Sequence, residues 1–198
     1  MAVKEILSIV SGILFVIAFF PYVRAIWKTR HLPSGHPDKI EPSKASWLIW
    51  ASLDTITFAA MLMKHTVNGQ IVGAVGGSWI VTALVMKFGK SGWTKLDKFC
   101  LGGAFLGIVL GFTFKSPVLA MLTSNVTVII GSLPTFESAY KDPGKEDRMA
   151  WTIMWVSCVI AIVAIPQWTF MDSAQVIAFT TIETMMMVLL WIKPRFSK

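Results

Sequence analysis

The sequence predicts an all-α membrane protein with seven transmembrane helices. Three observations support this fold class: the composition, the spacing of the apolar segments and the distribution of positive charge. Hydrophobic residues make up 55% of the 198 residues and charged residues only 15%, and the mean hydropathy is +0.65. Because a water-soluble surface needs a larger charged fraction, a chain of this composition is expected in a lipid bilayer.

Seven apolar segments each have about the length that a helix needs to cross a bilayer, roughly 20 residues. The segments are separated by short polar stretches that contain turn-forming residues. The first segment is not followed by a small-residue cleavage site, so it is interpreted as a retained helix and not as a signal peptide. The predicted spans are residues 6–27, 45–63, 70–86, 99–114, 118–140, 149–165 and 174–192.

Positive charge falls almost entirely on one side of this seven-span arrangement. Of the 18 Lys and Arg residues, only Lys4, Lys64 and Lys115 lie on the other side. Cytoplasmic loops of membrane proteins carry such an excess of Lys and Arg, which predicts an N-terminus outside and a C-terminus in the cytoplasm. The net charge of +7 is thus explained by topology in a cell inner or plasma membrane, and no nucleic-acid partner is expected.

An internal repeat relates the two halves of the chain. Pro21 and Pro134 lie 113 residues apart, each near the end of a predicted helix and followed by an aromatic residue and a lysine. Further pairs with similar spacing are Trp27 and Tyr140, Lys28 and Lys141, Trp47 and Trp151, and Gln70 and Gln175. The repeat divides the chain into a three-helix unit at 1–90, a linker helix at 91–116 and a second three-helix unit at 117–198. Since an odd number of spans separates equivalent helices, the two units are expected in the same orientation.

The motif Pro-x-Val-x-x-x-Trp-Lys at 21–28, with a polar loop and Ser46-Trp47 at the start of the next helix, resembles the PQ-loop superfamily. This superfamily includes the SWEET and SemiSWEET sugar transporters, the lysosomal cystine transporter and the KDEL receptors. The resemblance covers essentially the whole chain and implies a 3+1+3 arrangement of helices. The second position of the signature, usually Gln, is Tyr22 in the first unit and Thr135 in the second, which indicates a divergent, bacterial-type branch.

Two carboxyl side chains are predicted near the middle of the membrane. Asp54 and Glu183 each lie about 15 Å into their spans, at 1.5 Å per residue of helix. Ionisable groups at this depth are costly and indicate a function or a pairing partner. We expect them to bind a polar substrate or to exchange protons. The alternative, carboxyl groups held neutral by Thr55, Thr181 or Thr184, stays open.

Aromatic and polar residues on neighbouring spans complete the predicted substrate site. Tryptophan rings can stack on a sugar or a heterocycle, but they are also common at membrane interfaces, where Trp47 and Trp151 are expected. For Asn125, a hydrogen bond between helices is the open alternative. The substrate-binding candidates are Trp50, Asp54, Ser78, Trp79, Asn125, Trp155, Thr181 and Glu183.

Pro21 and Pro134 are predicted hinges, because a proline inside a membrane helix removes one backbone hydrogen bond. The alternative is that they only end their helices early. Arg24 and Glu137 occupy equivalent positions in the two units and carry opposite charges, so they are candidates for an ionic gate. Alternatively, each extends separately to the membrane surface.

These patterns predict a membrane transporter or facilitator for a small polar solute such as a sugar, an amino acid or a vitamin. A seven-helix receptor or sensor is the alternative. No nucleophile with a neighbouring base and no metal-ligand spacing is found, so neither an enzyme, a metal nor a cofactor is predicted. Membrane lipid and the solute are the expected partners. Proton coupling is left open, as is a homo-oligomer packed through the small-residue stripe Gly103, Gly107 and Gly111.

Overall fold

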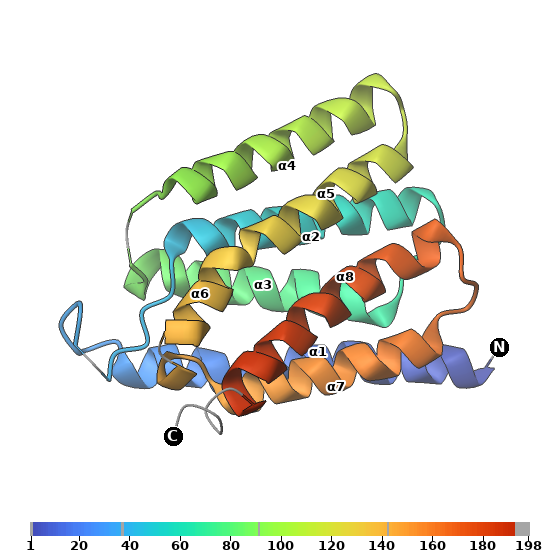
Figure 1. Cartoon of the computed structure of the whole chain (residues 1–198). Coiled ribbons are helices and arrows are strands. Elements are labelled where there is room, and N and C mark those ends of the chain that lie inside the picture. The colour runs from blue at the N-terminus through green and yellow to red at the C-terminus, as the bar shows by residue number, and fades with distance from the viewer. Residues whose placement is uncertain (1, 37, 91, 142, 193–198) are drawn as a thin grey trace.

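The structure is a computed structural model that describes residues 2–36, 38–90, 92–141 and 143–192, and helices dominate it (Figure 1). The elements are α1 (Ala2–Thr29), α2 (Lys44–Met63), α3 (Gly69–Phe88), α4 (Lys95–Thr113), α5 (Pro117–Gly131), α6 (Leu133–Lys141), the short 3-10 helix η1 (Pro143–Lys145), α7 (Arg148–Ala164), α8 (Phe170–Met187) and the π-helical turn η2 (Val188–Ile192). The all-α prediction is confirmed.

Each predicted span coincides with helical structure. Among the described residues, five helical segments are long and apolar enough to cross a membrane: Val3–Thr29, Lys44–Met63, Gly69–Phe88, Pro117–Lys141 and Phe170–Ile192. α7 is a shorter apolar helix. α4 occupies the fourth predicted span and starts one turn earlier than expected, because it includes the charged residues at its N-terminus.

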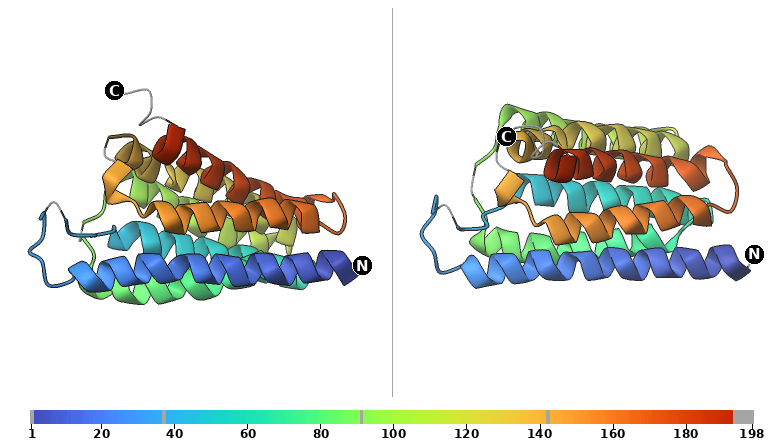
Figure 2. Two further views of the ribbon diagram at one scale, coloured as in Figure 1. Left: turned by 90° about the horizontal axis from the view of Figure 1, so that it is seen from below. Right: turned by 60° about the horizontal axis from the view of Figure 1, so that its bottom comes forward.

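The fifth predicted span is not a single α-helix. α5 ends at Gly131 and α6 begins at Leu133, with Ser132 between them, and α6 turns away from the direction of α5 (Figure 1). The break lies just before Pro134, which has no backbone N–H for the helical ladder. α1, in contrast, runs through Pro21 as one continuous helix (Figure 2). The two predicted hinges therefore differ, and only the one at Pro134 coincides with a helix break.

The helices pack in the same pattern in both halves of the chain. α3 contacts both α1 and α2, and α8 contacts both α5 and α7. The two groups of three meet mainly between α1 and α7 and between α2 and α5, with smaller contacts of α2 with α8 and of α3 with α7. α4 packs on α5 and α2 at the edge of the bundle (Figure 1).

Glycines allow α1 and α3 to approach closely. A Cβ atom added to Gly12 would lie 2.3 Å from the backbone oxygen of Gly69, and one added to Gly69 would lie 2.1 Å from that of Ser8. Such distances are too short for any side chain, so the backbones touch only because both residues are glycine. On α4, a Cβ at Gly103 would lie 2.7 Å from Oγ1 of Thr127, so this part of the small-residue stripe packs inside the chain. The surroundings of Gly107 and Gly111 lie outside the described part.

Buried hydroxyl groups link the two groups of helices. Between α1 and α7, Ser157 donates to the backbone oxygen of Ser11 at 2.8 Å, and Ser11 donates to that of Ser157 at 3.0 Å. Between α2 and α5, Thr57 donates to Ser124 at 2.8 Å, and Ser124 donates to the backbone oxygen of Leu53 at 2.8 Å. Ser11 and Ser124 are 113 residues apart, like Pro21 and Pro134. Equivalent positions thus make equivalent contacts.

Replacing Gly12 by alanine should lower the free energy of unfolding by about 1–3 kcal/mol, because the added methyl group meets backbone atoms that cannot move separately. The matched control is Gly76→Ala on α3, where an added Cβ meets nothing within 4 Å. This control should be neutral or stabilising by up to about 1 kcal/mol. Thermal unfolding of both variants in detergent checks the prediction, and equal behaviour of the two would contradict it.

Candidate functional site

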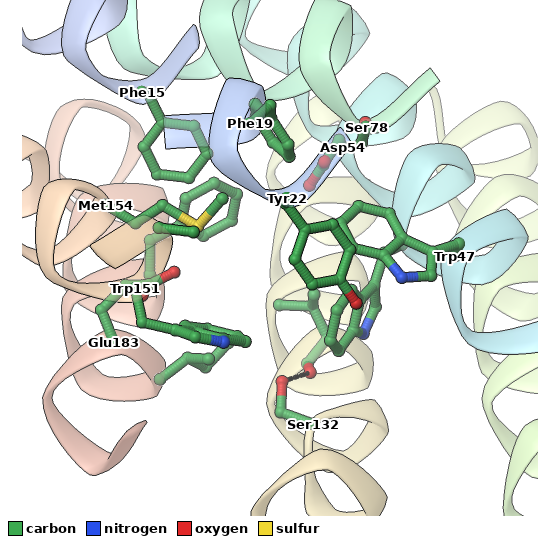
Figure 3. A pocket seen from close by; sticks show the side chains of 15 residues that line it. Phe15, Phe19, Tyr22, Trp47, Asp54, Ser78, Ser132, Trp151, Met154 and Glu183 are labelled. Atoms are coloured by element: carbon green, nitrogen blue, oxygen red, sulfur yellow. Dashed lines mark hydrogen bonds between the residues drawn. The ribbon is translucent and has the colours of Figure 1, made fainter. Parts of the chain in front are cut away.

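A cavity of about 80 Å³ lies between the two groups of helices. It is large enough for several water molecules or one small ligand. Most of its wall is aromatic or aliphatic (Figure 3). Its lining residues are Phe15, Phe19, Tyr22, Trp47, Trp50, Asp54, Ser78, Val128, Ser132, Ala150, Trp151, Met154, Phe179, Ile182 and Glu183.

Four of the predicted substrate-binding residues line this cavity: Trp50, Asp54, Ser78 and Glu183. Asp54 is 7% exposed and Glu183 is 5% exposed. The carboxyl group of Asp54 lies within hydrogen-bonding reach of Ser78 (Figure 3). In contrast, Oε2 of Glu183 and Nε1 of Trp50 are buried without a hydrogen-bond partner among the described residues. A buried polar atom without a partner is costly, so both atoms are available to a ligand or to water.

Two predicted tryptophans do not line the cavity. Trp79 is 43% exposed, and its indole N–H donates to Oγ1 of Thr55 at 3.0 Å. Trp155 donates in the same way to Oγ1 of Thr184 at 3.1 Å. Both tryptophans link neighbouring helices of one group. Thr55 and Thr184, proposed as partners for the buried carboxyl groups, accept these indole bonds.

Thr181 and Asn125 also lie away from the cavity lining. Thr181 is exposed, and its hydroxyl donates to the backbone oxygen of Ile177 at 2.8 Å, as is common for threonine in a helix. Asn125 is only 6% exposed, and neither atom of its amide group has a partner among the described residues. The helix-to-helix hydrogen bond considered for Asn125 is therefore not formed in this conformation.

Trp47 and Trp151, which were expected at the membrane interface, are buried within the protein. Each is 8% exposed and lines the cavity. Trp47 packs against Tyr22 and Trp50, with ring centroids 5.3 and 5.4 Å apart. The equivalent positions of Trp47 and Trp151 in the repeat could have indicated a shared role in the cavity. A tryptophan at the start of a helix is typical of membrane interfaces, however, and this pattern favoured the other interpretation. Sequence reasoning also missed Phe15, Phe19 and Phe179, because nothing in the pattern of an apolar helix says which face meets a cavity.

The cavity wall follows the repeat. Several pairs of lining residues are separated by 113, 104 or 105 residues, the offsets of the repeat. These pairs are Phe15 and Val128, Phe19 and Ser132, Trp47 and Trp151, Trp50 and Met154, and Ser78 and Glu183. The equivalent of Asp54 is Cys158, which is buried close to Glu183. Each group therefore brings one carboxyl group and one weaker polar group, Ser78 or Cys158, on its second and third helices.

A buried amide network closes one end of the cavity. Gln70 and Gln175, equivalent in the repeat, are at most 1% exposed, and Gln175 donates to Gln70 at 3.1 Å. Asn68 donates to Gln175 at 3.0 Å, and Gln70 donates to the sulfur of Cys158 at 3.0 Å. Phe15 and Phe179 lie between this network and the rest of the cavity, with centroids 5.8 Å apart.

Two further pockets lie beyond the ends of the cavity. At the end where α1 begins, the N-terminal end, a pocket of about 940 Å³ reaches Gln70 and shares no described lining residue with the cavity. At the opposite end, the loop end, which carries residues 30–43, a pocket of about 360 Å³ shares its inner wall with the cavity. The shared residues are Tyr22, Trp47, Trp50 and Trp151. One aromatic layer thus separates the cavity from the loop end. Two layers, the ring pair Phe15 and Phe179 and the amide network of Gln70 and Gln175, close the N-terminal end.

The predicted ionic gate is not formed in this conformation. Glu137 pairs with Lys141 one turn further along α6, and both side chains are exposed. Arg24 is exposed and, in the described part of the chain, makes no ion pair with Glu137. An ion pair within one helix is the simpler contact, because it needs no approach of two helices. The side chain of Pro134, the remaining hinge candidate, lies outside the described side chains.

Glu146 is a titratable group at the loop end that sequence reasoning missed. It lines the 360 Å³ pocket and accepts a hydrogen bond from Nε1 of Trp151 at 3.0 Å. Burial raises the pKa of Glu146 to about 7; the Trp151 N–H opposes this shift, and Asp147 adds to it. Because Trp151 also lines the cavity, the protonation state of Glu146 bears directly on the aromatic layer.

Comparisons of the chain with protein-family models, with curated protein sequences and with solved structures give no match.

Replacing Glu146 by glutamine should remove a pH-dependent loss of stability. Since the pKa of Glu146 is about 7 in the folded chain and 4.5 ordinarily, the folded state binds more protons between these values, and wild-type stability falls as pH rises through this window. At pH 8, Glu146→Gln should be more stable than wild type by about 1–3 kcal/mol, and at pH 4 it should be nearly equal. Thermal unfolding across pH 4–8 measures this; an identical pH profile of the two proteins would refute it.

Proposed function

We propose that this chain is a membrane transporter or facilitator for a small polar solute, which binds in the cavity between two three-helix units. The observation that carries the proposal is the cavity itself. It combines two buried carboxyl groups with polar atoms that lack a partner, and its wall is built from equivalent positions of two groups of helices that pack alike. A polar site at the interface of two repeats is typical of secondary transporters.

The proposed architecture is a 3+1+3 arrangement in the manner of the PQ-loop superfamily, with units at 1–90 and 117–198 and a linker helix at 91–116. Two observations support it. The contacts of α1, α2 and α3 are matched by those of α5, α7 and α8, whereas α4 packs at the edge. The repeat-related glutamines Gln70 and Gln175 also hydrogen-bond to each other, as expected for residues that meet at the axis between two units.

In the proposed orientation the loop end faces the cytoplasm and the N-terminal end faces outside. The supporting observation is the charge distribution, since the connections at the N-terminal end carry few Lys and Arg residues. In this orientation the present conformation is closed to the outside by two layers. The cavity is separated from the cytoplasm by only one aromatic layer, so the present conformation is closest to an inward-facing state.

Transport then requires the two units to tilt against each other around the cavity. Outward opening separates Gln70 from Gln175 and Phe15 from Phe179, and inward opening separates Trp47 from Trp151. The helix break at Ser132 offers a point at which α6 can move without α5. Bistable packing of this kind converts small shifts at a site into opening at one end.

The charge of Asp54 and Glu183 must be neutralised during solute transport. An ionised carboxyl group buried without a positive partner costs several kcal/mol, so each group needs either a proton or a bound cation. Coupling of solute movement to protons is therefore part of the proposal. The remaining titratable groups close to the cavity are Tyr22 on α1, Cys158 on α7 and, at the loop end, Glu146.

A receptor that holds a ligand without moving it is the second candidate. The double closure of the N-terminal end favours it, because a ligand that enters from the loop end would find no exit. The two candidates differ in flux and not in binding.

The test is uptake by the purified chain in proteoliposomes, with and without a pH gradient, for a panel of labelled sugars, amino acids and amines. We expect saturable uptake of at least one solute, and at least tenfold slower uptake in Asp54→Asn and Glu183→Gln, because both changes remove a proton- or ligand-binding charge from the cavity. The control is Asp38→Asn, which removes a carboxyl group that is 85% exposed and should leave uptake unchanged. Binding without uptake would favour the receptor. Normal uptake by both cavity variants would remove the carboxyl groups from the mechanism.

A further inference from the structure

The charges that line the cavity are all of one sign. Asp54 on α2 and Glu183 on α8 face it from different units. Of the described lining residues, none is Lys, Arg or His, and among the described residues neither carboxyl group forms an ion pair. A buried acidic pair without a counter-charge leaves room for a positive group that the chain itself does not supply.

One oxygen of this pair is already free to bind. Glu183 is 95% buried, since its exposed fraction is 5%, and its Oε2 has no partner among the described residues. Its repeat equivalent Ser78 lies beside Asp54 instead. The free oxygen is therefore a position at which a donor or a cation can bind.

The rest of the wall is suited to a cation rather than to a neutral polar molecule. Tyr22, Trp47 and Trp50 form a continuous aromatic surface with centroid spacings of 5.3 and 5.4 Å, and Phe15 and Phe179 add rings at the other end. The face of an aromatic ring attracts a cation within about 6 Å of its centre. Aromatic surfaces of this kind recognise alkylammonium groups, whose charge is spread over apolar methyl groups.

Other ligand classes fit less well. An anion would face two carboxyl groups and no base. A sugar needs many hydrogen-bond donors and acceptors, but the nearby amides Gln70 and Gln175 bond to each other outside the cavity. Among the described lining residues there is no Asn or Gln.

We propose that the cavity binds a small organic ammonium ion between Asp54 and Glu183, within the aromatic wall. The inference rests on the proposed function only for movement of the ion across the membrane, because binding can be measured without transport. A methylated ammonium head with a short polar substituent fits best, since the indole N–H of Trp50 is buried without a described partner and can donate to a hydroxyl group on the ligand.

The probes are tetramethylammonium and choline, compared at constant ionic strength with tert-butanol, a neutral molecule of similar shape, and pivalate, an anion of similar shape. Thermal unfolding of the purified full chain in detergent is measured as a function of each probe, because a ligand that binds the folded state raises its apparent stability. We expect stabilisation by an ammonium probe at concentrations at least tenfold lower than by tert-butanol, and none by pivalate.

Variants assign the effect to the cavity. Glu183→Gln keeps the size of the side chain and removes its charge, so the ammonium concentration needed for stabilisation should rise at least tenfold. Asp38→Asn, on the surface, should not change it. Glu183→Asp, which keeps the charge, should bind better than Glu183→Gln and serves as a second variant if glutamine impairs folding.

Equal stabilisation by tert-butanol or pivalate, no stabilisation by either ammonium probe, or an unchanged response in a folded Glu183→Gln protein would each overturn the proposal. Uptake of labelled tetramethylammonium or choline into proteoliposomes separates it from the proposed function. Binding without uptake upholds the ammonium site and contradicts transport. Uptake of a neutral or anionic solute without ammonium binding upholds transport and contradicts the ammonium site.

Discussion

Two buried carboxyl groups without a basic partner are the constraint on which the site depends. Asp54 and Glu183 lie in an apolar, largely aromatic cavity, where an uncompensated charge is expensive. A chain that spans a membrane gains no stability from such groups, so their presence is best explained by a ligand or a proton that neutralises them in turn. The aromatic wall and the free oxygen of Glu183 would both contact such a ligand.

The repeat explains where the cavity lies. Glycine contacts hold α1 close to α3. The two groups of helices meet along extensive contacts, α1 with α7 and α2 with α5, and their polar contacts are a few hydroxyl pairs and the bond between Gln70 and Gln175. Polar contacts of this kind are modest in strength, about 0.6 kcal/mol each on average in membrane helices. The cavity lies at this interface, since both groups of helices contribute to its wall.

The sequence predicted the helices well because long apolar segments separated by polar, turn-rich stretches identify them. It also predicted hinges at Pro21 and Pro134 from the missing backbone N–H, but only Pro134 lies at a helix break. The position of side chains around each helix was less predictable. Trp47 and Trp79 are the same residue type in similar apolar segments, so the sequence does not distinguish them. Trp47 lines the cavity, whereas Trp79 donates a hydrogen bond to Thr55 on the outer side. In a membrane helix both faces are apolar, so the periodicity that identifies a buried face in a soluble protein is lost. Asp54 and Glu183, which are costly to bury in an apolar helix, are two of the four predicted residues that line the cavity.

Transport as proposed requires the two three-helix units to move against each other around the cavity. Ser11 and Ser157 test it directly, because their hydroxyl oxygens lie 3.1 Å apart across the contact between α1 and α7. In a protein whose native cysteines are replaced by serine, Ser11→Cys with Ser157→Cys can be crosslinked by oxidation, with each single variant as control. We predict that proteoliposome uptake is lost when the crosslink forms and returns when it is reduced. Undiminished uptake by fully crosslinked protein would contradict it.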